Sequence, residues 1–335
     1  LIHPLFLSGS YLINSVKSAA LFLLPGDDIA INMGMAALLF MMSLLVITFY
    51  VNLPYQLWLL THKFLGIAFF MGTIHAFLIP SDISRDPLLR IYMFSFMGIG
   101  IIAYLFRTVL GRFFVRRFPY IVSSVRKLRD NVVEISLTPN SQKKFDYLPG
   151  QFIFVSFSQP LSEVHPFSLS SAPGGNLIFA AKVLGDYTNK LATVPLGSEA
   201  SVEGPFGRFS YFVHHNQKQV WIAGGIGITP FVSMARSLNP RISVDLYYTV
   251  SDNAEAAYME ELTRIAGLNP GLRVFLWATH QKGRLTGQII KDTSLLDNQD
   301  IFICGPPQMM YSLKQQLRKL GMSGRHIHTE EFQML

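Results

Sequence analysis

Two histidines in one apolar, helix-length stretch have a spacing that suits metal ligation across a membrane. His62 and His75 lie thirteen residues apart, which is about 20 Å at the rise of an α-helix. A hydrocarbon layer is roughly 30 Å thick, so one imidazole would lie toward each leaflet, as two stacked haems require. Ionisable side chains at membrane depth normally face a cavity, a partner or a cofactor. A pair of neutral histidines hydrogen-bonded between helices is the alternative from this stretch alone.

The rotation between the two histidines adds a condition. At about 100° per residue, thirteen steps place them roughly 140° apart around a regular helix, so they would not share one face. Either two haems lie on offset sides of this helix, or a π-bulge near Gly66 or Gly72 rotates one end of it.

Two glycine turns suit the binding of a pyrophosphate. Residues 223–231, Ala-Gly-Gly-Ile-Gly-Ile-Thr-Pro-Phe, follow an apolar strand and open a helix, whose free N–H groups can bind phosphate. Residues 303–307, Ile-Cys-Gly-Pro-Pro, end a later predicted strand of the same sheet. Open α/β sheets bind ligands at the carboxyl ends of their strands, so the two turns are predicted to flank one nucleotide. Either alone is also typical of an ordinary tight turn.

Three upstream motifs suit a flavin. They are His-Pro-Phe-Ser-Leu-Ser-Ser at 165–171, Lys-Val-Leu-Gly-Asp-Tyr-Thr at 182–188 and Gly-Pro-Phe-Gly at 204–207. Their hydroxyls, histidine and glycine turn could together hold a flavin ring and its phosphates. Singly, each motif is compatible with ordinary turn chemistry.

The elements that must position these residues are long apolar stretches before residue 110 and short strands and helices after it. The apolar stretches 29–51, 57–79 and 88–110 are each long enough to cross a bilayer, and residues 1–13 resemble the end of another such helix. The chain therefore looks like a fragment that lacks upstream membrane helices. Arginines and lysines crowd residues 107–129, which places that end in the cytoplasm. His62 then lies near the inner face, and His75 and His3 near the outer face.

Beyond residue 110 the composition is that of a soluble, folded region. Short alternating strands between 120 and 203 predict a small antiparallel barrel, and strands alternating with helices from 220 onward predict a parallel α/β sheet. The formal charge is +7, but we find no basic groove interleaved with stacking aromatics, which argues against nucleic acid. Cys304 is the single cysteine, which excludes an intrachain disulfide and an iron–sulfur cluster.

The order of these motifs along the whole chain resembles the ferric reductase and NADPH oxidase superfamily, and most closely its bacterial predicted ferric reductases. The resemblance implies a multi-domain chain: an α-helical transmembrane haem-binding bundle at 1–112, an antiparallel β-barrel FAD domain at 117–215 and an α/β NAD(P)-binding domain at 216–335. This is a ferredoxin-reductase-like arrangement. It also implies FAD, NADPH or NADH, and two b-type haems.

Site residues follow from the same resemblance. His165, Pro166, Phe167 and Ser168 would line the isoalloxazine. The ribityl chain and phosphates would be approached by Ser170, Ser171, Lys182, Gly185, Asp186 and Thr188. Gly225, Gly227 and Thr229 would hold the dinucleotide pyrophosphate, and Cys304, Gly305 and Pro306 would position the nicotinamide. Glu331 and Phe332 resemble a C-terminal Glu-x-Phe region whose aromatic covers the flavin. Ser168, Cys304 and Phe332 are the residues expected to contact the reacting rings.

The haem ligands implied by the resemblance are histidine pairs on two membrane helices. His62 and His75 match the second helix, and residues 1–5 resemble the distal end of the first. His3 and His75 would ligate the outer haem, and His62 the inner haem with a partner upstream of Leu1. The alternative for His3 is a histidine at a loop end.

Several other residues remain undecided. Tyr247 and Tyr248 could sandwich an adenine or be buried, and Ser251 or Arg273 could select NADPH. The remaining histidines carry no spacing that argues for zinc: His280, His326 and His328. His214 and His215 lie next to Asn216 in a predicted domain linker and are expected to be solvated and not to bind a metal.

The expected activity is that of a flavocytochrome b oxidoreductase in a bacterial inner or plasma membrane. Electrons would pass from cytoplasmic NAD(P)H through FAD and haem to an external acceptor, ferric chelate before oxygen. A superoxide-generating NADPH oxidase, an electron-transfer subunit feeding a periplasmic partner enzyme, and a flavin reductase anchored by haem-free helices are the alternatives.

Overall fold

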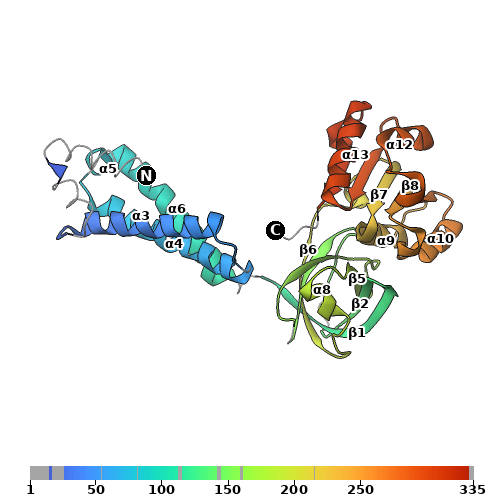
Figure 1. Ribbon diagram of the computed structural model, residues 1–335, viewed down its shortest axis with the longest axis horizontal. Coiled ribbons are helices and arrows are strands. Elements are labelled where there is room, and N and C mark those ends of the chain that lie inside the picture. Colours follow the sequence, from blue (N-terminus) through green and yellow to red (C-terminus); the bar gives the residue numbers. More distant parts are fainter. Residues whose placement is uncertain are drawn as a thin grey trace. The chain divides into compact units, whose positions relative to one another are not determined.

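The computed structural model forms two compact units, Leu1–Val115 and Arg116–Leu335 (Figure 1). The residues that it describes are 15–16, 26–53, 55–80, 82–111, 115–141, 145–158, 161–214 and 216–331. His3, His215 and Phe332, which the sequence analysis singled out, lie outside the described residues. The two units are considered separately below.

Long apolar helices make up the described part of the first unit. They are α3 (Ile29–Tyr50), α4 (Tyr55–Leu78) and α6 (Pro87–Leu105), with the short α5 (Asp82–Arg85) between the last two. Asp28 and Asp86 cap α3 and α6 by accepting hydrogen bonds from the first backbone N–H groups, which satisfies donors that a helix leaves open. By length and composition, Ile29–Tyr50, Leu57–Leu78 and Pro87–Thr108 could each cross a membrane.

The histidine helix is regular. Helix α4 is α-helical throughout Tyr55–Leu78, so there is no π-bulge near Gly66 or Gly72 and that interpretation is wrong. A π-helical segment lies instead at Phe106–Leu110, directly after α6. Gly66 allows α6 to approach, because a Cβ at this position would lie 2.0 Å from the ring of Tyr104. His62 and His75 therefore lie on different faces of one straight helix.

The second unit begins with a six-stranded antiparallel sheet in the order β4-β3-β6-β1-β2-β5. The strands are β1 (Arg117–Arg129), β2 (Val132–Pro139), β3 (Phe152–Phe157), β4 (His165–Ser168), β5 (Leu177–Lys182) and β6 (Glu199–Phe206). A bridge between Leu169 and Phe179 joins the two ends of this order, so the sheet closes on itself. Alternate side chains, including Ile135, Ile153 and Val202, fill the interior. The predicted antiparallel barrel is confirmed.

A parallel five-stranded sheet in the order β11-β10-β7-β8-β9 follows. Its strands are β7 (Lys218–Gly224), β8 (Ser243–Val250), β9 (Leu272–Ala278), β10 (Asp300–Cys304) and β11 (Ile327–Glu330). Its helices are α9 (Thr229–Arg236), α10 (Met259–Leu268), α11 (Thr279–Lys282), α12 (Gly287–Ser294) and α13 (Pro307–Lys319). The apolar side chains of α9 and α10 pack in one core and those of α12 and α13 in another, so the two pairs cover opposite faces, and the predicted α/β sheet is confirmed.

The barrel and the parallel sheet share buried contacts within the second unit. Val132 of β2 and Ala180 of β5 belong to the same hydrophobic core as Phe231 of α9 and Tyr258, which precedes α10. The two halves therefore hold their motifs in a fixed relation to each other.

Candidate active site

Strand β4 presents the first flavin motif at the edge of the barrel. The imidazole of His165 stacks on Tyr187 at 3.5 Å between centroids, and His165 and Pro166 remain half-buried. Phe167 and Ser168 are buried, and the Phe167 ring stacks on Phe179 at 4.4 Å. Tyr187 lies within a predicted motif but was not chosen from the sequence, because its contact with β4 is tertiary.

Ser170 and Ser171 join the barrel to the nucleotide-binding half. Their backbone carbonyls accept hydrogen bonds from Arg236 at 2.8 Å and Ser233 at 2.5 Å, both in α9. The Ser170 hydroxyl donates to the carbonyl of Ile178, and the Ser171 hydroxyl accepts from the Ile178 N–H. Both side chains are buried. Their predicted role toward the flavin phosphates stays a prediction, and their observed role is interdomain contact.

The second flavin motif, at 182–188, runs into the start of helix α8 (Asp186–Leu191). The hydroxyl of Thr188 accepts hydrogen bonds from the backbone N–H groups of Leu184 and Gly185, which turns the chain into the helix. Gly185 and Asp186 are exposed there. Lys182, at the end of β5, lines a small cavity together with Gly225 of the nucleotide-binding half. The structure therefore brings these two motifs together.

The two glycine turns of the parallel sheet lie against each other. Cys304 of β10 pairs with Ala223 of β7, so both strands end at the same edge. A Cβ on Gly227 would lie 2.4 Å from the carbonyl oxygen of Cys304, and Gly225 has a φ of 55°, which glycine tolerates best. Glycine is thus required for the two turns to meet at the edge where parallel sheets bind ligands.

The remaining residues predicted at this edge differ in accessibility. Pro306 is exposed and Gly305 is half-buried, so both can approach a ligand. Thr229 is buried, and its hydroxyl donates to the carbonyl of Ile226.

Glu330 connects this edge to the barrel. It pairs with Cys304 in the β10–β11 ladder, and its Oε1 lies 2.6 Å from the position that a Cβ on Gly207 would take. Gly207 in turn contacts Phe152, which pairs with Ser168 across β3 and β4. Ser168, Gly207, Glu330 and Cys304 therefore belong to one connected region of the molecule.

The ionisation of this region is unusual. Burial raises the pKa of Glu330 to about 7, and its Oε2 is buried without a hydrogen-bond partner among the described residues. Burial also raises the pKa of the Cys304 thiol, so the sulfur remains protonated. Glu331, the acidic residue predicted from the sequence, is exposed. The spacing Glu-x-Phe, counted back from Phe332, points to Glu330 and could have identified it.

A network of hydrogen bonds and ion pairs connects the barrel to the helices of the parallel sheet. The carboxylate of Glu134 is buried in β2 and accepts hydrogen bonds from Arg126 and from the hydroxyl of Tyr258. Arg236 makes a bidentate ion pair with Glu261, with both distances at 2.8 Å. Charge-assisted and bidentate pairs are the strongest hydrogen bonds in proteins. This network was not anticipated from the sequence.

Comparison with known families identifies this arrangement. Residues 117–245 match the family described as an FAD-binding domain, and residues 221–315 match the oxidoreductase NAD-binding domain. Residues 117–315 form a ferredoxin reductase-like, FAD- and NAD-binding module. These matches support the FAD-binding and NAD-binding parts of the resemblance to ferric reductases.

Individual relatives share the reductase module. The flavohemoprotein of Bordetella pertussis is 27% identical over 216 residues, which cover 56% of this chain and 53% of that protein. The toluate 1,2-dioxygenase electron transfer component of Pseudomonas putida is 25% identical over 224 residues, covering 63% of this chain and 66% of that protein. This chain thus spans about half the length of the flavohemoprotein.

A solved structure supports the same fold. The ferredoxin NADP+ reductase from Neisseria gonorrhoeae, with bound FAD and NADP, superposes with a TM-score of 0.57 at 19% identity, over 64% of this chain and 98% of that chain.

Two dinucleotide contacts considered from the sequence do not fit the reductase module. Tyr247 and Tyr248 are each 1% exposed, so they pack in the cores and cannot sandwich an adenine. Arg273 forms a bidentate pair with Asp245 at 2.6 Å, toward the amino-terminal ends of β8 and β9. It therefore lies away from the edge that holds the glycine turns. At that edge β8 is followed by Asp252, whose carboxylate lies 3.0 Å from His280 Nδ1.

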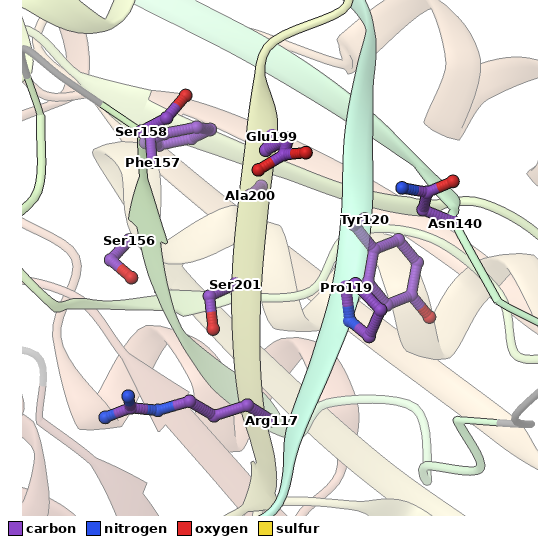
Figure 2. Close-up of a pocket in the computed structure, with 10 residues that line it drawn as sticks. All are labelled: Arg117, Pro119, Tyr120, Asn140, Ser156, Phe157, Ser158, Glu199, Ala200 and Ser201. Atoms are coloured by element: carbon purple, nitrogen blue, oxygen red, sulfur yellow. The ribbon is translucent and has the colours of Figure 1, made fainter.

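A hollow of about 460 Å³ also lies on the barrel, over strands β1, β3 and β6. Figure 2 shows the side chains that line it, with Arg117, Ser156 and Ser201 among them. None of the predicted flavin or dinucleotide residues lines this cavity. It is therefore separate from the candidate active site.

In the first unit, the two described histidines have different surroundings. Nδ1 of His75 lies 2.7 Å from the carbonyl oxygen of Ala30 in α3. Gly34 makes room for this ring, since a Cβ there would lie 2.6 Å from His75 Nδ1. The ring of His62 lies 4.0 Å from that of Trp58, and its Nδ1 is buried without a hydrogen-bond partner among the described residues.

Proposed function

We propose that this chain is an NAD(P)H-dependent FAD oxidoreductase that passes electrons through b-type haem to an acceptor across a membrane. The observation that carries the proposal is the combination, in one chain, of a reductase module at 117–315 with three apolar helices of membrane-crossing length. The second of these helices holds His62 and His75.

The reductase module would receive the electrons. Bound FAD accepts a hydride from a nicotinamide and releases electrons singly. The backbone N–H groups at Gly225 and Gly227 would bind the dinucleotide pyrophosphate, and Cys304 and Gly305 would position the nicotinamide beside the barrel. The carboxyl of Glu330, with its pKa raised to about 7 by burial, can hold or release a proton near neutral pH. The buried hydroxyl of Ser168 would orient the reacting edge of the flavin.

The residues of the first unit fit a haem ligand role. A metal-bound imidazole normally donates its other N–H to a carbonyl, which fixes the tautomer. His75 has this arrangement, because Nδ1 faces the Ala30 carbonyl at 2.7 Å and the lone pair is then on Nε2. The same contact also fits a neutral histidine hydrogen-bonded between helices. Spectroscopy is therefore needed to distinguish the two.

The topology follows from charge. Arg107, Arg116 and Arg117 lie near the end of the last apolar helix, and positively charged residues favour the cytoplasmic side. We infer a multi-pass protein of a bacterial inner or plasma membrane with the reductase module in the cytoplasm. Ferric chelate is the proposed external acceptor, and oxygen is the alternative.

A second function has a specific observation in its favour. The Pseudomonas putida relative is named an electron transfer component of a dioxygenase. The chain would then supply electrons to a partner enzyme in place of a small acceptor. Copurification of a stoichiometric partner, without ferric reduction by the isolated protein, would favour it.

The decisive experiment is an absorbance spectrum of the purified chain before and after reduction by NADH or NADPH, combined with a ferric reduction assay. We expect flavin bleaching, b-type haem bands and ferric reduction that superoxide dismutase does not inhibit. Inhibition by the dismutase would support superoxide formation. Flavin bleaching without haem bands would refute electron transfer across the membrane.

A further inference from the structure

Three side chains without a role in the proposed reaction meet near the amino-terminal ends of β10 and β11. His214 follows the 3-10 turn Tyr211–Val213, Asp300 begins β10, and His328 is in β11. One ligand atom of each residue lies within 4.8 Å of the others. The two imidazole rings are 3.8 Å apart between centroids. These residues come together from three separate parts of the sequence, so no spacing motif predicted the cluster.

The donor set is that of a transition-metal site. Two imidazoles and one carboxylate suit divalent first-row metals such as zinc, cobalt or iron. With bonds of about 2.0 to 2.2 Å in tetrahedral geometry, neighbouring ligand atoms lie about 3.3 Å apart. His328 Nε2 and Asp300 Oδ1 are already 3.0 Å apart. Only small shifts are needed for these two groups to share an ion.

A supporting residue holds the carboxylate in place. Nδ1 of His326 lies 3.0 Å from Oδ1 of Asp300, and ligating carboxylates are characteristically held by such outer hydrogen bonds. His328 Nε2 lies at the same distance from this oxygen, so the carboxylate is held between two imidazoles.

The cluster is accessible to an ion. His214 and His328 line a cavity of about 420 Å³, and Arg208, Thr329 and Glu330 also line it. The cavity provides an entry path and space for a water molecule on the metal. The ring of Phe302 packs against both imidazoles and restricts their orientation. Its centroid lies 5.3 Å from that of His214 and 4.8 Å from that of His328.

We propose that His214, Asp300 and His328 bind one divalent first-row transition-metal ion, with water in the remaining position. The ion would connect the segment between the barrel and the parallel sheet to strand β11, which ends at Glu330. It would thereby hold the strand that carries the Glu330 carboxyl. The competing arrangement is a metal-free cluster in which Asp300 accepts hydrogen bonds from the imidazoles.

The test is titration of the metal-stripped, full chain with Zn²⁺ by calorimetry and with Co²⁺ by visible absorption. We expect one ion per chain with a Kd of about 1 μM or tighter, and Co²⁺ bands typical of low coordination number. His214→Gln and His328→Gln should each weaken binding at least about 100-fold. His326→Gln should weaken it about 10- to 100-fold, the range for supporting residues.

The matched control is His280→Gln. His280 also faces a carboxylate, that of Asp252 at 3.0 Å, but it lies outside the cluster of His214, Asp300 and His328. Its Zn²⁺ affinity should equal that of the unsubstituted chain. Flavin absorbance and melting temperature establish that each variant is folded. Should His328→Gln not fold, His214→Gln gives the same readout from a loop position. Absence of saturable binding, or equal affinity in His214→Gln and the control, would overturn the proposal.

Discussion

The Glu330 carboxyl ionises at an unusual pH, and this has a direct consequence for stability. Burial raises its pKa to about 7 from 4.5, so between these values the folded chain binds a proton that the unfolded chain releases. The contribution of this carboxyl to the free energy of unfolding is therefore complete below about pH 4.5 and is lost as the pH rises toward 7. The corresponding free energy is on the order of 3 kcal/mol.

Glu330→Gln should remove this pH dependence. The amide is neutral at every pH, so the melting temperature should vary less between pH 5 and pH 8, and the variant should be the more stable protein at pH 8. Melting curves followed by flavin fluorescence at both values provide the measurement. The exposed neighbour Glu331→Gln is the control. An equal pH dependence in both variants would contradict the burial argument.

The acidic residue after β8 leads to a prediction about the dinucleotide. Asp252 follows the second strand of the parallel sheet in sequence order, where an acidic residue hydrogen-bonds the ribose hydroxyls of NAD and repels a 2′-phosphate. We expect NADH to be preferred over NADPH. Asp252→Ser should lower the ratio of kcat/KM for NADH to that for NADPH by about tenfold, equivalent to about 1.4 kcal/mol. A ratio below one in the unsubstituted chain would refute this.

At the scale of elements, helix α9 connects the glycine turn at 223–231 to Ser170, which follows strand β4. Its Arg236 binds both the Ser170 carbonyl and the Glu261 carboxylate. Arg236→Ala leaves both acceptors partly buried and unpaired, so we expect a loss of about 2 to 4 kcal/mol in stability. Urea unfolding of this variant and of Arg264→Ala, an exposed position on α10, provides the comparison. A cost no larger than that of Arg264→Ala would show that the network is unimportant.

Gly34 of α3 allows the His75 ring of α4 to pack closely against α3. Gly34→Ala places a methyl group 2.6 Å from Nδ1 of His75, so the ring must leave the Ala30 carbonyl. We expect a cost of about 1 to 3 kcal/mol from overpacking, together with a shift or loss of haem absorbance. Gly72→Ala, in the same bundle, has nothing within 4 Å of its Cβ and should be neutral or slightly stabilising. Equal spectra and melting temperatures for both variants would remove His75 from the ligand assignment.

The elements themselves were largely predictable, and their side-chain environments were not. Continuous apolar runs suffice to locate helices such as α4 and strands such as β7, because the length of the run separates a membrane-length helix from a short buried strand. Ser170, Ser171 and Glu330 required tertiary information, since their partners lie 62 or more residues away in the chain or come from another strand. The cluster of His214 and His328 likewise depends on strand register. Hydroxyls in a turn motif can serve a ligand or a neighbouring helix, and sequence alone does not distinguish these roles.

At the scale of the whole chain, the proposed function separates into two measurable halves. The reductase module, with its own buried cores, should reduce bound flavin regardless of the state of the apolar helices. Transfer to an external acceptor should depend on the histidines of α4. His75→Ala should therefore leave the rate of flavin reduction by NADH within about twofold, while ferric chelate reduction should fall at least about 100-fold, because the variant lacks the imidazole that would bind the haem. Stopped-flow flavin bleaching and steady-state ferric reduction on the same preparation test both halves, with Arg264→Ala, at an exposed position, as the control. Unchanged ferric reduction in His75→Ala would mean that electrons leave directly from the reductase module, as in an electron transfer component.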